Sequence, residues 1–163
     1  MNAWQMSPAV QQWMVKHIPR SATVLELGGG TGSVALHAAF RTTTVEHDER
    51  WTAYLRRTGL ATHHAPIDED GWYTMTPELE RHLSTADVVV IDGPPGALRK
   101  NATRHLDQIK PGAFVIFDDS NRPDVAAMIL YPTVAVLRDE NRTTHITKKP
   151  CPAHQNDKPA SLG

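Results

Sequence analysis

The fold is decided by residues 24–33, which read Val24-Leu25-Glu26-Leu27-Gly28-Gly29-Gly30-Thr31-Gly32-Ser33. Apolar residues flank one acid, four glycines follow within five positions, and an apolar run then begins at Val34. This order predicts a strand, a tight glycine-rich turn and a helix. Glycine suits such a turn because it adopts backbone conformations closed to other residues and lets a ligand approach the main chain. The amides that open the helix can then hold a polar group.

Two phosphate-binding motifs fit this turn poorly. A dinucleotide fingerprint G-x-G-x-x-G beginning at Gly28 would need glycine where the sequence has Ser33, and a phosphate loop would need a Gly-Lys pair that is absent. The pattern that does fit is Glu-x-Gly-x-Gly-x-Gly, from Glu26 to Gly32. It resembles the first motif of class I S-adenosylmethionine-dependent methyltransferases. An ordinary glycine-rich turn between a strand and a helix is the alternative.

Composition sets limits on the class of protein. The chain has 163 residues, which predicts one domain with its own core. With 17 basic and 18 acidic residues, it shows no electrostatic signature for nucleic acid or an anionic membrane. Its single cysteine, Cys151, excludes an internal disulfide and a cysteine-rich zinc site. No apolar run approaches a membrane span and no signal peptide is visible, so we expect a cytoplasmic protein.

Strand and helix patterns alternate along the chain. The run 87–92 is apolar between two aspartates and the run 113–118 is apolar up to Asp118, which predicts parallel strands buried on both faces. Ser7 and Pro8 form a helix start signal, and Pro19 ends that helix. Similar signals predict further helices over about 34–40, 51–58, 77–83, 98–109 and 123–130, and strands over 42–45, 61–67, 133–137 and 143–147.

This alternation predicts an α/β protein with a single Rossmann-like, doubly wound sheet of seven strands, mostly parallel and closed by a C-terminal antiparallel hairpin. The closing hairpin distinguishes the methyltransferase arrangement from the dehydrogenase one, so the resemblance covers about residues 22–148. We expect residues 1–148 to form the class I methyltransferase-like domain. Residues 149–163, rich in proline and polar groups, are expected to be a flexible tail.

The resemblance implies S-adenosylmethionine as the cofactor, bound beyond the carboxyl ends of the strands. Glu46 ends the second strand 20 residues after Glu26, the spacing at which an acid accepts hydrogen bonds from ribose hydroxyls. Glu26 would orient the glycine turn and the methionine amino group, and Asp68 would meet the adenine amino group, although Glu69 and Asp70 are equally available. The expected cofactor-binding residues are Glu26, Gly28, Gly30, Gly32, Ser33, Glu46, His47, Asp68 and Asp92.

Three aspartates follow the fourth and fifth strands. Asp92 ends one strand and the pair Asp118-Asp119 ends its neighbour, so all three should meet at one edge of the sheet. Such charges need a cation or protons as compensation, and a hard divalent ion prefers oxygen ligands. The arrangement resembles the magnesium site of small metal-dependent O-methyltransferases. Alternatively, Asp118 and Asp119 cap the next helix or face solvent, and Asp92 contacts only the cofactor.

The resemblance implies a mechanism in which Mg²⁺, held by Asp92, Asp118 and Asp119, binds two hydroxyls of the acceptor and lowers the pKa of one. Asp92 and His105 are the predicted catalytic residues, His105 being a candidate general base beside Lys100 and His37. Sugar-methylating relatives often have an acid where this chain has Pro94, so the identity of the base stays open, and a metal-activated hydroxyl needs none.

The leading expectation is therefore O-methylation of a hydroxylated small molecule or sugar. The alternatives are a metal-independent methyltransferase acting on a nitrogen, a protein or a nucleic acid, and a cofactor-binding module without activity of its own. Residues 92–96 are distantly similar to the Asp/Asn-Pro-Pro-aromatic motif of DNA amino-methylating enzymes. Gly96 stands where the aromatic residue is required, which argues against base methylation. Small enzymes of this fold commonly pair, so the resemblance leaves room for a homodimer.

Overall fold

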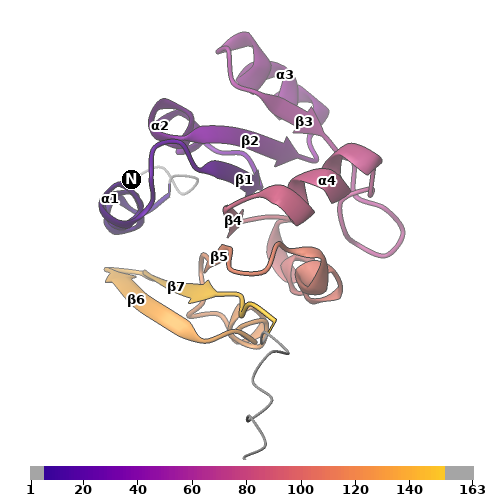
Figure 1. Ribbon diagram of the computed structural model, residues 1–163. Helices are drawn as coiled ribbons and strands as arrows, with labels where there is room; N and C mark the ends of the chain where they lie inside the picture. Colours follow the sequence, from indigo (N-terminus) through magenta and orange to yellow (C-terminus); the bar gives the residue numbers. More distant parts are fainter. Residues whose placement is uncertain (1–5, 153–163) are drawn as a thin grey trace, which may run out of the picture.

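The computed structural model describes residues 6–152. Its centre is one seven-stranded sheet in the order β3-β2-β1-β4-β5-β7-β6 (Figure 1). The five strands from β3 to β5 run parallel, and β7 is antiparallel both to β5 and to β6. The predicted doubly wound sheet with its antiparallel C-terminal hairpin is therefore confirmed.

The elements follow the predicted order with revised ends. The strands are β1 (Thr23–Leu27), β2 (Arg41–Glu46), β3 (Thr62–His64), β4 (Val88–Ile91), β5 (Phe114–Phe117), β6 (Thr133–Asp139) and β7 (Arg142–Lys148). The helices are α1 (Pro8–His17), α2 (Ser33–Ala39), α3 (Glu49–Arg57), α4 (Pro77–Thr85), the 3-10 helix η1 (Gly96–Gln108) and α5 (Pro123–Ala126).

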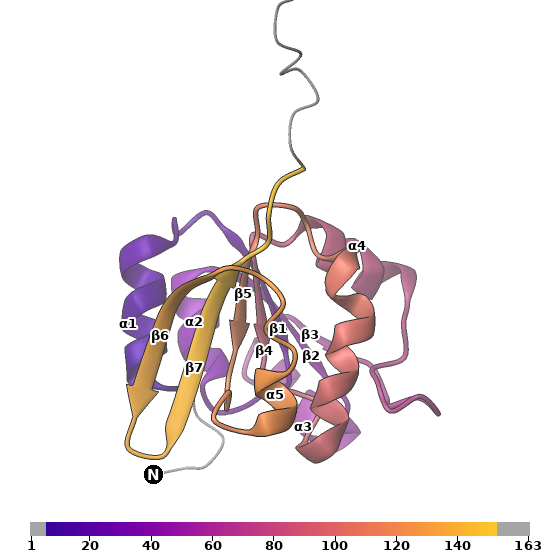
Figure 2. The same cartoon turned by 90° about the horizontal axis from the view of Figure 1, so that it is seen from below.

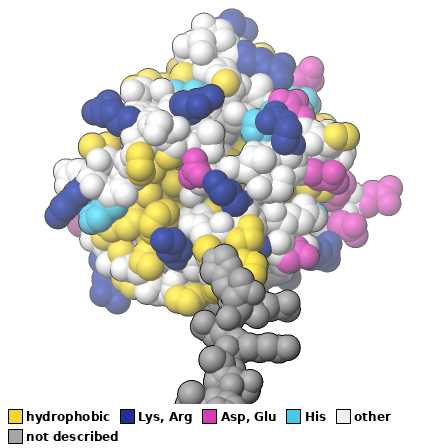
Figure 3. Space-filling model, viewed as in Figure 1, with side chains coloured by type: hydrophobic (Ala, Val, Ile, Leu, Met, Phe, Trp, Pro, Cys, Tyr) yellow, Lys and Arg dark blue, Asp and Glu magenta, His cyan; other side chains and the backbone are white. Residues whose placement is uncertain are grey.

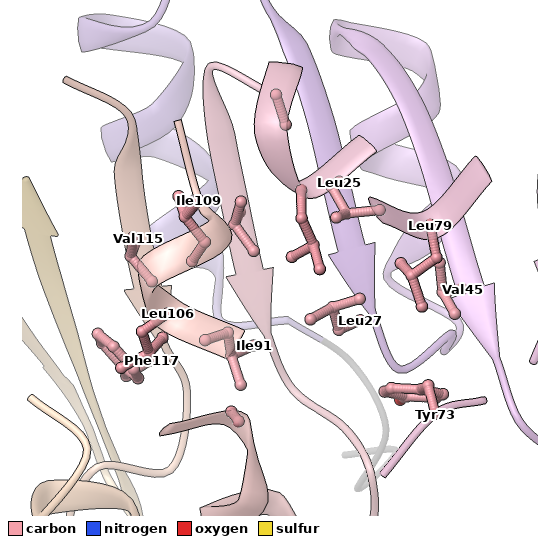
Figure 4. Packing of buried hydrophobic residues seen from close by; sticks show 14 of the residues in the cluster. Leu25, Leu27, Val45, Tyr73, Leu79, Ile91, Leu106, Ile109, Val115 and Phe117 are labelled. Atoms are coloured by element: carbon pink, nitrogen blue, oxygen red, sulfur yellow. The ribbon is translucent and has the colours of Figure 1, made fainter. Parts of the chain in front are cut away.

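Side chains alternate between the two faces of the sheet, and each face has its own core. α1 and α2 cover one face, where Val10, Met14 and Leu36 pack with Val88 and Val90 (Figure 2). α4, η1 and α5 cover the other face. There Leu25, Leu27, Val89, Ile91 and Phe117 pack with helix residues such as Leu79 and Leu106 (Figure 4). Because β4 is buried on both faces, it contains only apolar residues.

Two elements are shorter than predicted. β3 covers only 62–64 instead of 61–67, because the chain turns away at Pro66, whose carbonyl accepts from both the amide and the hydroxyl of Thr74. α5 ends at Ala126 instead of Leu130. Beyond it, the amides of Met128 and Ile129 bond three residues back, as in a series of tight turns.

The chain beyond β7 is held to the domain as far as the structure describes it. Nζ of Lys149 donates to the carbonyls of Leu106, Asp107 and Ile109, at 3.2, 2.6 and 2.5 Å. Most of the predicted flexible tail, residues 153–163, lies outside the described part of the chain. Among residues 6–152 no helix has the length and apolar character needed to cross a membrane.

Candidate functional site

A pocket of about 350 Å³ opens where β1, β2 and β4 end. In the parallel part of the sheet these are carboxyl ends, the edge at which ligands bind in doubly wound folds. The pocket collects residues from four separate loops and from the start of α3. They are Gly28, Gly29, Gly30, Glu46, His47, Asp48, Trp51, Tyr73, Asp92, Gly93 and Pro95.

The glycine turn lies against the loop after β4. Gly28 has a φ of +99°, and a Cβ there would lie 2.6 Å from the amide nitrogen of Gly93. A Cβ on Gly29 would lie 2.6 Å from Cδ1 of Leu55 in α3. At Gly28 both the backbone conformation and the space available require glycine, whereas a Cβ on Gly29 would need the end of the Leu55 side chain to shift. The main chain of the turn is left bare toward the pocket.

Glu46, the last residue of β2, lines this pocket with its carboxylate. Its Oε2 accepts a hydrogen bond of 2.9 Å from the amide of Gly29, and its Oε1 accepts one of 2.7 Å from the amide of Asp48. Nδ1 of His47 lies 2.7 Å from the same Oε1. The side chain is buried apart from the pocket, so its orientation is set before any ligand arrives.

Glu26 lies beneath the turn and does not line the pocket. Its Oε2 accepts a hydrogen bond of 2.6 Å from the hydroxyl of Thr44 in β2. Burial raises the pKa of Glu26 to about 7, although the hydrogen bonds from Thr44 and Ser33 oppose the shift. The hydroxyl oxygen of Ser33 also accepts from the amide of Gly30, at 3.0 Å. Glu26 and Ser33 thus support the turn from below.

Two aromatic side chains complete the pocket. Nε1 of Trp51 donates to the carbonyl of Gly29 at 2.9 Å, and its ring stacks on Tyr54 at 4.8 Å. Tyr73 is fully buried, and its hydroxyl has no hydrogen-bond partner among the described residues. An orphaned buried hydroxyl costs about 1–3 kcal/mol unless a ligand satisfies it. Tyr73 lines the pocket, but its hydroxyl is packed against the loop at Gly93 and is closed off from the space that a ligand would fill.

The three predicted aspartates converge beside the pocket. One carboxylate oxygen from each of Asp92, Asp118 and Asp119 lies within 4.8 Å of the others. Asp92 alone of the three lines the pocket, and Asp118 is buried behind it. Burial raises the pKa of Asp92 to about 8, helped by the charge of Asp118 and opposed by Arg99. Burial also raises the pKa of Asp118, against the hydrogen bond from Thr144.

Two arginines, which the sequence analysis missed, neutralise this cluster. The Arg99 guanidinium lies 3.2 Å from Oδ1 of Asp92 and 3.1 Å from Oδ2 of Asp119. Arg142 lies 2.9 Å from Oδ2 of Asp118 and 3.4 Å from Oδ1 of Asp119. A signal for Arg99 was present: it falls on the buried side of η1 together with Ala102 and Leu106. A charged residue in an apolar stripe indicates a buried partner.

Several predicted residues lie elsewhere. Asp68 lies outside the pocket lining, and its Oδ1 accepts from the amides of Asp70 and Trp72, at 3.0 and 3.1 Å. His105 also lies outside the lining, with its ring stacked on Trp72 at 5.4 Å. His37 pairs with the Thr44 hydroxyl at 3.0 Å. A Cβ on Gly32 would meet the Met6 amide at 2.7 Å, so Gly32 accommodates the N-terminal segment.

The pocket fits S-adenosylmethionine better than the aspartate cluster fits a metal ion. The bare glycine turn and the Glu46 carboxylate suit a ligand that carries hydroxyls and a positive charge. The aspartates, by contrast, are already paired with two guanidinium groups and with the Thr144 hydroxyl. Mg²⁺ requires oxygens that are free to surround it, which this donor set does not supply.

Comparison with solved structures shows the fold of class I methyltransferases. An RNA methyltransferase from Salinibacter ruber, in complex with S-adenosyl-L-homocysteine, superposes with a TM-score of 0.62 at 18% identity, covering 93% of this chain and 97% of that one. The T. thermophilus 16S rRNA N2 G1207 methyltransferase, in complex with AdoMet and guanosine, gives 0.61 at 17% identity over 88% of this chain and 39% of that one. A predicted O-methyltransferase from Agrobacterium tumefaciens gives 0.59 at 14%, over 87% and 81%. No protein-family model and no curated protein matches the chain.

Proposed function

We propose that this chain binds S-adenosylmethionine in the pocket after β1, β2 and β4 and transfers its methyl group to a hydroxylated small molecule or sugar. The observation that carries the proposal is that one pocket joins the bare glycine turn, the buried Glu46 carboxylate and the Asp92 carboxylate. Its volume of about 350 Å³ falls in the range of small-molecule sites. The fold shared with methyltransferases, two of them in complex with the cofactor or its product, supports the same assignment.

The residues that line the pocket would have different roles in this reaction. Glu46 would accept hydrogen bonds from the ribose hydroxyls, and the turn would hold the methionine end of the cofactor. The methyl group would then face Asp92, which lines the pocket between the turn and the loop at Gly93 and Pro95. As the acceptor oxygen attacks the methyl carbon, the sulfonium loses its charge and the acceptor loses a proton, for which Asp92 is the nearest carboxylate in the lining.

A hydroxylated acceptor of modest size agrees with the lining of the pocket, which holds the acidic residues Glu46, Asp48 and Asp92 and no described lysine or arginine. Figure 3 shows the side on which the chain beyond β7 leaves the domain, away from the pocket, and there lysine and arginine side chains lie mostly singly among neutral and acidic ones. Acidic side chains gather at the edge where the loop between β3 and α4 lies. A polyanionic acceptor would instead need basic side chains beside the pocket, whose charged lining residues are the acids Glu46, Asp48 and Asp92. Metal assistance is not part of the proposal, because the arginines already compensate the aspartates.

The test is calorimetric titration of the chain with S-adenosylmethionine and S-adenosylhomocysteine, followed by transfer of a labelled methyl group to a panel of sugars and diols in the presence of EDTA. Micromolar binding and EDTA-resistant transfer are expected. A folded chain that binds neither compound contradicts the proposal. Binding followed by transfer only to RNA or protein acceptors would keep the cofactor and overturn the acceptor class.

A further inference from the structure

The carboxylate cluster contains a buried cation of its own. Arg99 is 5% exposed, and its guanidinium lies between the ends of β4 and β5. Nη2 donates to the main-chain carbonyl of Asp92 and lies 3.2 Å from its Oδ1, while Nη1 donates to the carbonyl of Asp118 and, at 3.1 Å, to Oδ2 of Asp119. One side chain from η1 thus joins both strand ends through main-chain and side-chain oxygens.

We propose that Arg99 is the resident cation of the Asp92, Asp118 and Asp119 cluster, that it excludes a divalent metal ion, and that it acts as a positioning residue for Asp92 at the pocket. Arg142 completes the compensation from the exposed side, where it pairs with Asp118 and Asp119. The part of the proposal that concerns the metal ion is independent of the proposed function. The affinity of the chain for a divalent metal ion can be measured without cofactor or acceptor.

The oxygen atoms of the cluster are nearly all in use. Oδ1 of Asp92 faces Arg99, Oδ1 of Asp118 accepts from the Thr144 hydroxyl at 2.7 Å, and its Oδ2 faces Arg142. The two oxygens of Asp119 face one arginine each. At least five of the six carboxylate oxygens therefore have a partner within the chain. A metal ion would have to displace these partners before it could gain ligands of its own.

Displacement is more costly for Arg99 than for Arg142. Arg99 is the more deeply buried of the two, and a buried cation that loses its partners is strongly destabilising. A guanidinium also stays charged at any pH at which a protein is folded, and its planar fork contacts two acceptors at once. Arg99 uses both terminal nitrogens in this way, so it supplies the permanent charge and the fixed geometry for which a metal ion would otherwise be needed.

The experiment is a titration with Mn²⁺ alone, followed by electron paramagnetic resonance. The wild-type chain is expected to show no stoichiometric site below about 1 mM. Arg99→Met removes the cation at nearly constant volume and should bind one Mn²⁺ at least tenfold more tightly. Adding Asp119→Asn to that variant should remove the gain. Arg104→Met is the matched control, since Arg104 is an exposed arginine of the same helix that pairs only with the exposed Asp70 loop, and it should behave as the wild type.

Two results overturn the proposal. One is a wild-type chain that binds one Mn²⁺ tightly and loses it in Asp118→Asn, which means that the arginines yield to a metal. The other is a folded Arg99→Met variant without any gain in Mn²⁺ affinity, which means that Arg99 is not what excludes the ion. Neither result concerns S-adenosylmethionine binding, so failure here and failure of the proposed function are distinguishable.

A second variant covers the case in which Arg99→Met does not fold without metal. Arg99→Lys keeps a positive charge in the cluster but cannot contact both strand ends with a fork. It should stay as inert to Mn²⁺ as the wild type, and it should restore S-adenosylmethionine-dependent turnover only in part, through kcat and not through cofactor affinity. A lysine variant that gains a metal site as Arg99→Met does would contradict the charge argument.

Discussion

The main-chain amide of Gly29 donates a hydrogen bond of 2.9 Å to Oε2 of Glu46. This contact joins the turn after β1 to the end of β2, two segments that the sheet already holds in parallel register. The acid that should bind ribose is therefore attached to the loop that should bind the methionine end. The two halves of the proposed cofactor site are consequently positioned relative to each other before the ligand enters.

Replacing Glu46 tests this cofactor site. Glu46→Ala should weaken S-adenosylmethionine binding by tenfold or more, because a hydrogen bond to a charged group contributes about 1.5–3 kcal/mol. Titration calorimetry measures the affinity, and thermal melting checks that the variant is folded. Glu49→Ala, an exposed acid three residues along the chain, should bind as the wild type does. An unchanged affinity in folded Glu46→Ala would remove Glu46 from the site.

The orphaned hydroxyl of Tyr73 makes a two-sided prediction. Tyr73→Phe removes an unsatisfied buried group, so the free energy of unfolding of the empty protein should rise by about 1 kcal/mol. Affinity for S-adenosylmethionine should stay within about twofold, because the hydroxyl is closed off from the pocket in the empty protein. Urea unfolding and calorimetry measure the two effects. Tyr54→Phe, at a residue that is 45% exposed, should change neither quantity.

Gly28 in the glycine turn and Gly59 after α3 allow the cost of backbone strain to be compared with the cost of steric overlap. Gly28 and Gly59 both have positive φ, of +99° and +83°. A Cβ on Gly59 meets nothing within 4 Å, whereas one on Gly28 meets Gly93 at 2.6 Å. Gly59→Ala should therefore lower the free energy of unfolding by about 1 kcal/mol, from strain alone, and Gly28→Ala by about 2–5 kcal/mol. Equal losses, measured by urea unfolding, would contradict the close approach of the two loops.

The raised pKa of Glu26 predicts how stability depends on pH. Its pKa is about 7 in the folded chain against 4.5 ordinarily, so the folded state holds the proton more tightly than the unfolded state does. The resulting stabilisation is complete below pH 4.5 and is lost as the pH rises toward 7. Relative to Glu26→Gln, the wild-type free energy of unfolding should fall by about 3 kcal/mol between pH 4.5 and 8.

Urea unfolding of both proteins at pH 4.5, 6 and 8 checks this difference. Glu80→Gln, an exposed acid of α4, serves as the control and should follow the wild type at each pH. A constant difference between the wild type and Glu26→Gln across this range would mean that Glu26 titrates normally in the folded chain.

The sheet was predictable because its strands carry strong local signals. β4 and β5 are continuous apolar runs, and the glycine turn marks the end of β1, so the alternation of strands and helices could be read along the chain. The end of β3 could not, because it depends on which backbone groups the loop at Pro66 and Thr74 satisfies. That is decided by contacts between segments and not by residue type.

The site was predictable in its acids and not in their partners. Asp92, Asp118 and Asp119 follow strands whose ends had to be neighbours, so their convergence follows from the topology. The place of Arg99 in the apolar stripe of η1 indicates a buried partner, but no spacing rule connects Arg99 or Arg142 to the strand ends. Asp68 illustrates the converse: it has the expected place in the chain, but its carboxylate is occupied by the amides of its own turn.

The two ends of the described chain leave the domain at opposite ends of the parallel strands. Met6 lies against Gly32, beside the glycine turn, whereas Cys151 lies against Gly112, where β5 begins. An affinity tag or fusion partner joined before Met6 would emerge next to the pocket and compete for the space around it. One joined after Pro152 would emerge on the far side, so the titrations above are best made with a C-terminal tag.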